Sequence, residues 1–396
     1  MNKKRIMVLG GNVVQAEATL TAKQSGYYTI STDLHKDNPG HAIADEYCPV
    51  DIIDKEAVLR EARRLHIDGI IPYTSDVLAP VAAYVSDAMH LPCSPYSAVE
   101  IMTHKDLFRE FLHSHGYNVP QGRSFTDKEE ALAFFRSLGG TAMMKPVDNA
   151  GSKGVFKVNS EEEICQHWQE SMDYSLSKRI IIEQFIERTG MQQDGDIFVS
   201  DGKIVFWSLG DQHKDPIAPF VPAVYTFPNT MPEEYEKKAK HTVQELITAL
   251  GFTQGPCNIE YIVSTKGEIY ILEIGPRNGG NLIPFGIQEV TGVDLTAMTV
   301  QAALGETVTV PEWKYSGYSA TVMLHSQEDG ILKGFNVPEE YRHRMKRSYT
   351  FRHEGDAVKR FHNTGDTIAS MAFRFDTREE LEQFTRIAIK GMVTLQ

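Results

Sequence analysis

The sequence predicts a protein of mixed α/β and α+β class, built from more than one structural unit. Its 396 residues exceed the roughly 100–200 residues of one typical globular domain. Residues 5 to about 100 alternate apolar strand-like runs with helical patterns, an order typical of parallel βαβ units. Between residues 179 and 275 short strand-like runs dominate instead, which indicates a second unit of different architecture.

The first unit, residues 1–102, is expected to form a Rossmann-like parallel sheet. Strands are predicted at 6–9, 27–32 and 69–73, with a helix over 55–65 between the last two. Two glycines, at 10 and 11, follow the first strand, as at the start of a dinucleotide-binding fold, but the full G-x-G-x-x-G is absent. We therefore favour a tight strand-to-helix turn that binds no cofactor over a small-molecule contact.

The second unit is expected over residues 103–310, with a smaller lid subdomain at about 103–188 and a larger catalytic subdomain at about 189–310. Within it, the stretch from Asp211 to Pro228 contains four prolines and is predicted to be a long irregular loop. That loop, with His213 and Lys214, is interpreted either as a substrate lid or as a proline-stiffened surface connection.

A third unit, an α+β module, is expected over residues 311–396. Strands are predicted at 319–324 and 370–375, and a final helix at 378–389.

Composition narrows the class of partner. The formal charge of −13 argues against nucleic acid, which requires basic patches. The charged start, residues 1–5, has no signal-peptide pattern, and no long apolar span follows, so a cytoplasmic protein without membrane contact is expected. The four cysteines lack metal-ligand spacing and are expected to be reduced, buried thiols.

Two facing carboxylates are the strongest chemical signal. The run from 256 to 275 alternates on both sides of a predicted two-residue turn at Lys266-Gly267. Counting outward from this turn gives the following cross-strand pairs: Thr265 with Glu268, Val263 with Tyr270, Ile262 with Ile271, Tyr261 with Leu272, Ile259 with Ile274, and Glu260 with Glu273. Facing like charges repel unless they share a proton or a cation, and paired carboxylates suit Mg²⁺. The alternative is a solvent-facing hairpin, or a register that differs by one residue.

Two further segments have the residues that a nucleotide needs. Lys145 ends an apolar strand and precedes a glycine-containing turn at 151–154, whose backbone N–H groups could fold over phosphates. The apolar strand from Arg179 to Glu187 offers a carboxylate, backbone donors and acceptors, and flat walls for adenine. Taken singly, each segment is equally typical of a surface lysine or a buried strand.

In this order along the chain, the segments resemble the ATP-grasp superfamily, from residue 1 to about 310. The resemblance implies an ATP-grasp fold and ATP-binding residues in three groups: Lys105 and Lys145 on the phosphates, Ser152, Lys153 and Gly154 in a mobile loop over them, and Glu183, Gln184, Phe185 and Ile186 at adenine. It implies Glu260 and Glu273 as ligands of Mg²⁺, with Mn²⁺ as an alternative metal. Asp194 and Asp196 are both candidates for the ribose-binding acid.

The resemblance also implies catalytic and substrate residues. Arg277 matches the arginine that meets the transferred phosphate or acyl group, and His213 and Asn281 are further substrate candidates. Many members carry an asparagine two residues after the second glutamate, where this chain has Gly275. Either Asn281 or water would then complete the metal shell.

The end regions resemble one branch of the superfamily more closely. Gly26-Tyr27-Tyr28 and residues 43–46 are similar to the leading domain of carbamoyl-phosphate-synthase-like enzymes and L-amino acid ligases. Residues 354–356 and Phe361 are similar to the C-terminal module of those ligases.

This branch implies an ATP-dependent ligase that joins a small carboxylate, such as an amino acid, to an amine through an acyl phosphate, acting as a homodimer. A carboxylase that activates bicarbonate is the first alternative. A non-catalytic ATP-binding module, suggested by Gly275, is the second. A nicotinamide-dependent oxidoreductase, supported only by Gly10-Gly11, is the third.

Overall fold

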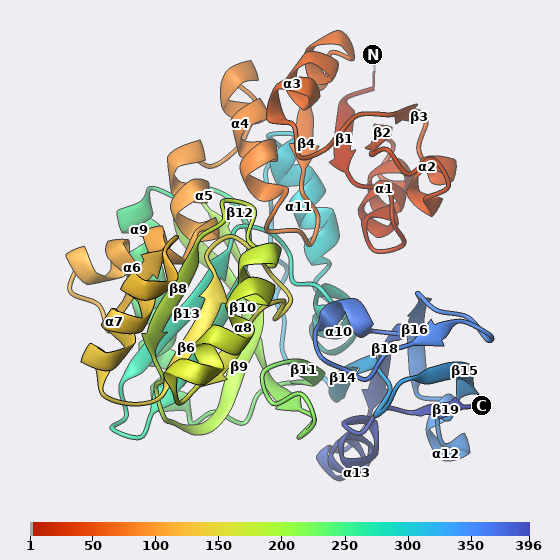
Figure 1. The fold of residues 1–396 in the computed structure, drawn as a ribbon. Coiled ribbons are helices and arrows are strands. Elements are labelled where there is room, and N and C mark those ends of the chain that lie inside the picture. The colour runs from red at the N-terminus through yellow and green to blue at the C-terminus, as the bar shows by residue number, and fades with distance from the viewer. Residues whose placement is uncertain (1–2) are drawn as a thin grey trace.

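The computed structural model describes residues 3–396, so the first two residues of the predicted first unit lie outside it. The N-terminal part forms the predicted parallel sheet, in the order β3-β2-β1-β4 (Figure 1). Its strands are β1 (Arg5–Leu9), β2 (Tyr28–Thr32), β3 (Glu46–Cys48) and β4 (Gly69–Ile71). The helices of this part are α1 (Gln15–Gln24), α2 (Pro39–Ile43), α3 (Lys55–Arg64) and α4 (Ala79–Met89).

Both glycine N–H groups in the turn after β1 are bonded within the protein. The N–H of Gly10 donates to the carbonyl of Thr32, and the N–H of Gly11 donates to Asp33 Oδ2, each at 2.8 Å. A Cβ at Gly11 would lie 2.3 Å from the ring of His41. The turn is therefore tight and internally bonded, as expected from the missing glycine motif.

A small antiparallel sheet follows, in the order β5-β8-β6-β7. Its strands are β5 (Gly122–Phe125), β6 (Ala142–Pro146), β7 (Phe156–Val158) and β8 (Ile180–Gln184). The helices in this stretch are α5 (Tyr96–Thr103), α6 (Lys105–Ser114), α7 (Lys128–Leu138) and α8 (Glu161–Tyr174). Apolar side chains of α7 and α8, among them Leu132 and Trp168, pack on Phe125 and Ile182 of the sheet.

The largest sheet has eight strands in the order β13-β12-β9-β10-β11-β14-β18-β16. Its strands are β9 (Arg188–Ser200), β10 (Lys203–Lys214), β11 (Pro222–Phe227), β12 (Gly255–Ser264), β13 (Ile269–Gly275), β14 (Tyr318–Leu324), β16 (Met345–Thr350) and β18 (Ala369–Phe375). The helices that contact it include α9 (Glu233–Leu250), α10 (Ile283–Thr291) and α11 (Leu295–Ala303). The fully buried Tyr261 of β12 packs in the same core cluster as Val243 and Ile247 of α9.

Strands after residue 310 continue this sheet, because β14 pairs with β11 of the preceding part. A separate three-stranded sheet, in the order β17-β15-β19, lies at the C-terminal end. The remaining elements are β15 (Gly330–Phe335), α12 (Glu339–Arg342), β17 (Ala357–Val358), the short 3₁₀ helix η1 (Thr364–Asp366), α13 (Arg378–Ala388) and β19 (Val393–Leu395). The division at residue 310 thus stays a prediction.

The prediction of a long irregular loop at 211–228 is wrong. Asp211 to Lys214 belong to β10, and residues 222–227 form β11, so only residues 215–221 connect two paired strands. The four prolines do not break the sheet because Pro222 lies at the first position of its strand, Pro228 follows its last residue, and Pro216 and Pro219 fall in the connection.

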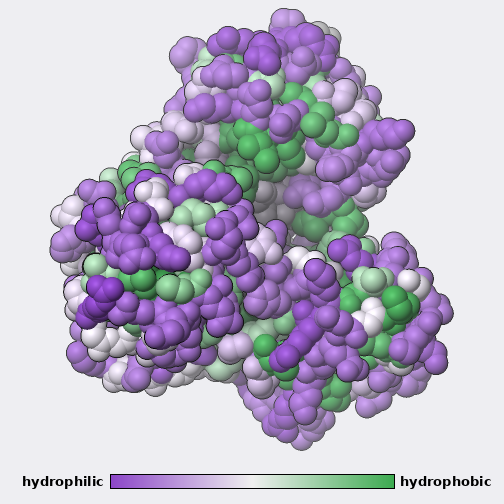
Figure 2. All heavy atoms as spheres, in the orientation of Figure 1, coloured by the Kyte–Doolittle hydropathy of each residue, from purple (hydrophilic) through white to green (hydrophobic). Residues whose placement is uncertain are grey.

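The four cysteines differ in their exposure to solvent. Cys48 and Cys257 are buried, as expected, but Cys165 is exposed, and all four thiols are free. No helix within residues 3–396 is long and apolar enough to cross a membrane. Figure 2 shows a mainly hydrophilic face, hollowed between the N-terminal part at the top and the C-terminal strands at the lower right.

Candidate active site

A cavity of about 530 Å³ lies where the two antiparallel sheets and the loop after β4 meet. The residues predicted from the sequence that line it include Lys105, Lys145, Ser152, Lys153, Glu183, Gln184, Phe185, Ile186, Glu260, Glu273, Arg277 and Asn281. Segments that are far apart in the chain therefore contribute to one site.

Glu260 lies directly opposite Glu273 in the β12–β13 ladder, as the sequence predicts. The reason is different from the expected one. The turn is one residue longer than predicted, since the N–H of Ser264 bonds to the carbonyl of Glu268. A bulge at Leu272 compensates, so Tyr261 pairs with Ile271 rather than with Leu272.

The bulge directs Leu272 and Glu273, which are consecutive residues, toward the same cavity. It also leaves the carbonyl of Leu272 outside the ladder, where Arg109 of α6 donates to it from Nη1 at 2.9 Å. The Arg109 side chain thus satisfies this carbonyl, which the bulge would otherwise leave as an unpaired buried acceptor.

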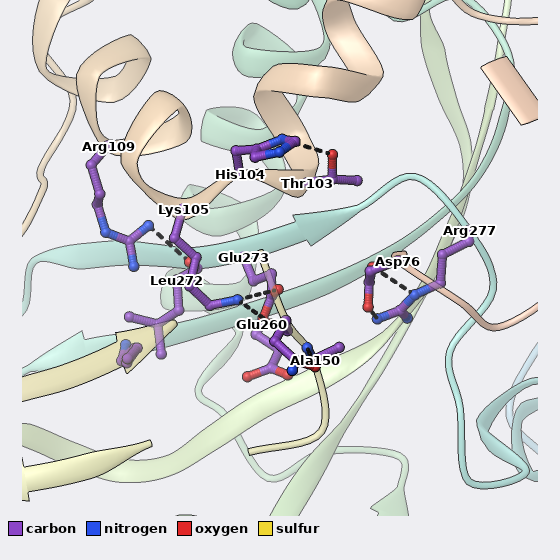
Figure 3. Close-up of polar contacts among 12 residues, drawn as sticks. Asp76, Thr103, His104, Lys105, Arg109, Ala150, Glu260, Leu272, Glu273 and Arg277 are labelled. Atoms are coloured by element: carbon purple, nitrogen blue, oxygen red, sulfur yellow. Dashed lines mark hydrogen bonds and ion pairs between the residues drawn. The ribbon is translucent and has the colours of Figure 1, made fainter. Parts of the chain in front are cut away.

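The two glutamates differ in their surroundings (Figure 3). Glu273 Oε1 accepts a hydrogen bond from Lys105 Nζ at 3.1 Å. Burial tends to raise the pKa of Glu273, but Lys105 and Arg277 outweigh burial and lower it. Glu260 Oε2 accepts from Gln192 Nε2 at 2.6 Å, and burial, Asp194 and Glu273 together raise the pKa of Glu260. Glu260 forms no ion pair within residues 3–396, and its raised pKa indicates a deficit of positive charge that a divalent cation could supply.

Lys145 is held by Glu183 across neighbouring strands. Its Nζ lies 2.5 Å from Glu183 Oε1, and Arg109 Nε donates to Glu183 Oε2 at 2.8 Å. Burial tends to raise the pKa of Glu183, but Arg109 and Lys145 outweigh it and lower the pKa to about 2. The Glu183 carboxylate therefore orients Lys145, and its contact with adenine stays a prediction.

The glycine-containing turn between β6 and β7 is fastened from two sides. Ser152 Oγ donates to the carbonyl of Phe220 at 3.0 Å, and the carbonyl of Gly151 accepts from Thr364 Oγ1 at 3.0 Å. A Cβ at Gly151 would lie 2.1 Å from Thr364 Oγ1, so only glycine fits this close approach. The C-terminal part thus reaches the turn that roofs the cavity.

Two predicted residues lie outside the cavity lining. Gly154 is a packing residue, whose Cβ would lie 3.0 Å from the backbone of Ser171. His213 is directed to Thr226 Oγ1, at 2.9 Å, and burial lowers its pKa. The next residue, Lys214, lines the cavity instead and donates to Gln192 Oε1 at 2.9 Å.

Of the two ribose candidates, Asp194 lines the cavity and Asp196 does not. Both are buried and both accept from Asn258 Nδ2, at 2.8 and 3.1 Å. Burial raises the pKa of both, to about 6 for Asp196. Within the described residues no group of three or more histidine, cysteine or acidic side chains could hold a metal, so the glutamate pair needs oxygen ligands of other kinds.

The residues of the site that sequence reasoning missed include Asp76, Arg109 and Thr364. Asp76 forms an ion pair with Arg277 in the cavity wall. No local pattern identifies these residues, although the amphipathic helix that holds Lys105 also holds Arg109 four positions later, on the same face.

One known protein family matches the middle of the chain, which contains most of this cavity's lining. Residues 140–284 match the family model of the ATP-grasp domain. The match identifies an ATP-grasp domain over residues 140–284, and the fold of the chain as a whole is an ATP-grasp fold.

Two solved structures have folds similar to the fold of this chain. The chain is similar to the L-amino acid ligase of Bacillus licheniformis, with a TM-score of 0.86, 22% identity and 100% of each chain covered. The biotin carboxylase domain of Hydrogenobacter thermophilus 2-oxoglutarate carboxylase, a dimer in complex with MgADP and bicarbonate, has a TM-score of 0.78 at 16% identity, covering 100% of this chain and 91% of that one. At these identities the likeness establishes the fold.

A relative by sequence is an uncharacterized protein of Sinorhizobium fredii, 28% identical over 301 residues. The alignment covers 72% of this chain, and the chain spans about 60% of the length of that relative.

Proposed function

We propose that the protein is an ATP-dependent carboxylate–amine ligase that forms an amide bond through an acyl phosphate. The observation that carries the proposal is the convergence, on one cavity, of a facing carboxylate pair with Lys105, Lys145 and Arg277. Three cations around two acids form a site for a highly charged anion with its metal.

The triphosphate would lie against Lys105 and Lys145, under the turn that holds Ser152 and Lys153. Adenine would contact the segment Gln184 to Ile186. The N–H of Gln184 donates to Gln121 and that of Phe185 to Thr141, whereas no hydrogen bond within residues 3–396 uses the N–H of Ile186. That donor can therefore meet a ring nitrogen of the base.

Glu260 and Glu273 would hold Mg²⁺, which when bound would neutralise charge on the phosphates. Asn281, which lines the cavity, can supply a further oxygen. A ligating side chain at Gly275 would require the Asp76 carboxylate to move, because the Cβ position lies 2.5 Å from Asp76 Oδ1.

The reaction has two steps. A substrate carboxylate oxygen attacks the γ-phosphorus of ATP, the bond from that phosphorus to the β–γ bridging oxygen breaks, and ADP leaves. The amine nitrogen then attacks the acyl carbon, loses a proton and expels inorganic phosphate. Lys105 and Lys145 would offset charge in the first step, and Arg277 would hold the acyl phosphate for the second.

A screen of purified protein with Mg·ATP tests the proposal. Small carboxylates and amines, amino acids first, are supplied singly and in pairs, while ADP and phosphate are measured and products are weighed by mass spectrometry. Amide product with one ADP per bond is expected. ATP binding without turnover across the panel would favour a non-catalytic module and sink the ligase.

The likeness to the bicarbonate-bound carboxylase favours one second candidate, a carboxylase that activates bicarbonate. ADP release that requires bicarbonate, and no other carboxylate, would support it. We also propose that the protein forms a homodimer in the cytoplasm, and size-exclusion chromatography with light scattering tests the assembly. We further propose domain boundaries at about residues 102 and 310, and limited proteolysis tests these boundaries.

A further inference from the structure

Arg277 and Asp76 form a two-pronged ion pair in the cavity wall (Figure 3). Arg277 Nε donates to Asp76 Oδ1 at 2.8 Å, and Nη2 donates to Oδ2 at 2.5 Å. The two side chains are only 10% and 11% exposed. Such a parallel pair fixes the plane of the guanidinium as well as its position.

The partners come from different parts of the chain, 201 residues apart. Asp76 lies in the loop between β4 and α4 of the N-terminal sheet, and Arg277 follows β13. Thr74, in the same loop, has φ of 60°, a conformation that is costly for a β-branched residue. The loop that presents Asp76 is therefore held in an unusual shape by its surroundings.

Gly275 makes the contact possible. A Cβ there would lie 2.5 Å from Asp76 Oδ1 and 3.1 Å from Arg277 Cζ. The φ of Gly275 is not positive, so lack of space, not backbone conformation, excludes a side chain. The glycine that departs from the family pattern is thus the residue that admits Asp76.

The ion pair leaves part of Arg277 available. A guanidinium has five N–H groups. Asp76 takes two, and the carbonyl of Asn278 accepts a third from Nη1 at 3.1 Å. Two N–H groups remain in a fixed plane, beside a cavity that Arg277 lines.

We propose that Asp76 is a positioning residue that fixes Arg277 toward the transferred phosphoryl or acyl group, and that Gly275 is required to admit it. The inference rests on the proposed function, because it assumes that Arg277 meets the reacting group. The N-terminal sheet then completes the active site rather than only flanking it.

Steady-state kinetics of Asp76→Asn, Gly275→Ala and the double variant test the proposal. Loss of a charged, buried hydrogen bond predicts a fall in kcat of about 10- to 100-fold for each single variant. The affinity for Mg·ADP should stay within about threefold of wild type, because the two lysines are untouched. The double variant should be no slower than the slower single variant, since both changes remove one contact.

Asp376→Asn is the matched control, since Asp376 pairs with Arg344 on the exposed surface, and it should leave kcat unchanged. An active wild type with a near-normal kcat in Asp76→Asn would overturn the inference and leave the ligase standing. A rise confined to the KM of the amine would assign Asp76 to amine binding and overturn it too. Additive losses of kcat in the double variant would overturn the inference and make the ion pair merely structural. A loss of Mg·ADP affinity as large as the loss of kcat would do the same.

Two further outcomes are decisive. If Asp76→Asn does not fold, Gly275→Ala alone decides, because it displaces the carboxylate without removing its charge. If wild-type protein turns over no substrate at all, the proposed function fails, and the inference fails with it.

Discussion

The guanidinium of Arg109 donates to the backbone carbonyl of Leu272 across 163 residues of sequence, at 2.9 Å. Leu272 is the bulge residue that brings Glu273 opposite Glu260. The same guanidinium binds Glu183, which in turn holds Lys145. One buried arginine therefore connects the facing pair of glutamates to Lys145.

Replacing this arginine should destabilise the protein. Arg109→Met leaves the Leu272 carbonyl unpaired and removes one of the two cations on Glu183. We expect a loss of about 3–5 kcal/mol in the free energy of unfolding, the usual cost of breaking a buried ion pair. Urea titration measures it, with Arg123→Met as the control, because the Arg123–Glu130 pair is exposed on both sides. A loss of unfolding free energy equal to that of Arg123→Met would show that the contacts of Arg109 do not stabilise the protein.

Glu273→Ala should abolish turnover while the fold survives. The variant removes one of the two facing acids, so Mg·ATP loses a ligand, whereas β13 keeps its backbone pairing. Glu268→Ala is the control, because Glu268 lies on the same hairpin at the turn, away from the cavity. Turnover and circular dichroism are measured together. Near-normal turnover in Glu273→Ala would sink the metal assignment.

The buried acids should make stability without metal depend on pH. Burial raises the pKa of Asp196 to about 6, above the value of about 3.9 expected in an unfolded chain. The folded protein then binds more protons between these values, so the free energy of unfolding falls as pH rises from about 4 to about 6. Asp194 and Glu260, whose pKa values burial also raises, act in the same direction.

The measurement is chemical unfolding in EDTA at several pH values. Asp196→Asn should flatten the slope between pH 4 and 6, whereas Asp201→Asn, at an exposed turn, should leave it unchanged. An identical slope in Asp196→Asn and wild type would contradict the proton linkage.

Thr364→Val should loosen the turn over the cavity. The variant removes the hydroxyl donor to the Gly151 carbonyl, a bond worth about 0.5–1.5 kcal/mol. We expect the KM for ATP to rise about 3- to 10-fold with little change in thermal midpoint. Thr350→Val, on the exposed side of β16, is the control. If both variants keep the wild-type KM, Thr364 does not fasten the turn during turnover.

Much of the fold follows from local patterns. Alternation and apolar runs predicted β1, α3 and α13 to within about one residue, because each element depends on its own side-chain spacing. The segment at 211–228 was mistaken for a loop because its prolines are conspicuous, whereas strand pairing depends on partners elsewhere in the chain.

The sequence by itself predicted five residues that the structure brings to one cavity: the two glutamates, the two lysines and Arg277. It also predicted that Glu260 faces Glu273, although two deviations from the assumed hairpin cancelled to give that result.

Tertiary structure alone decided how these groups are held. Asp76 meets Arg277, Arg109 meets Leu272, and Thr364 meets Gly151, each across more than 160 residues. Local spacing contains no information about such partners, because side-chain contacts between distant segments arise only when the sheets pack together. For the same reason, the sequence pattern alone suggests that Gly275 stands in place of a metal ligand. In the folded chain, the absence of a side chain at Gly275 leaves room for the Asp76 carboxylate.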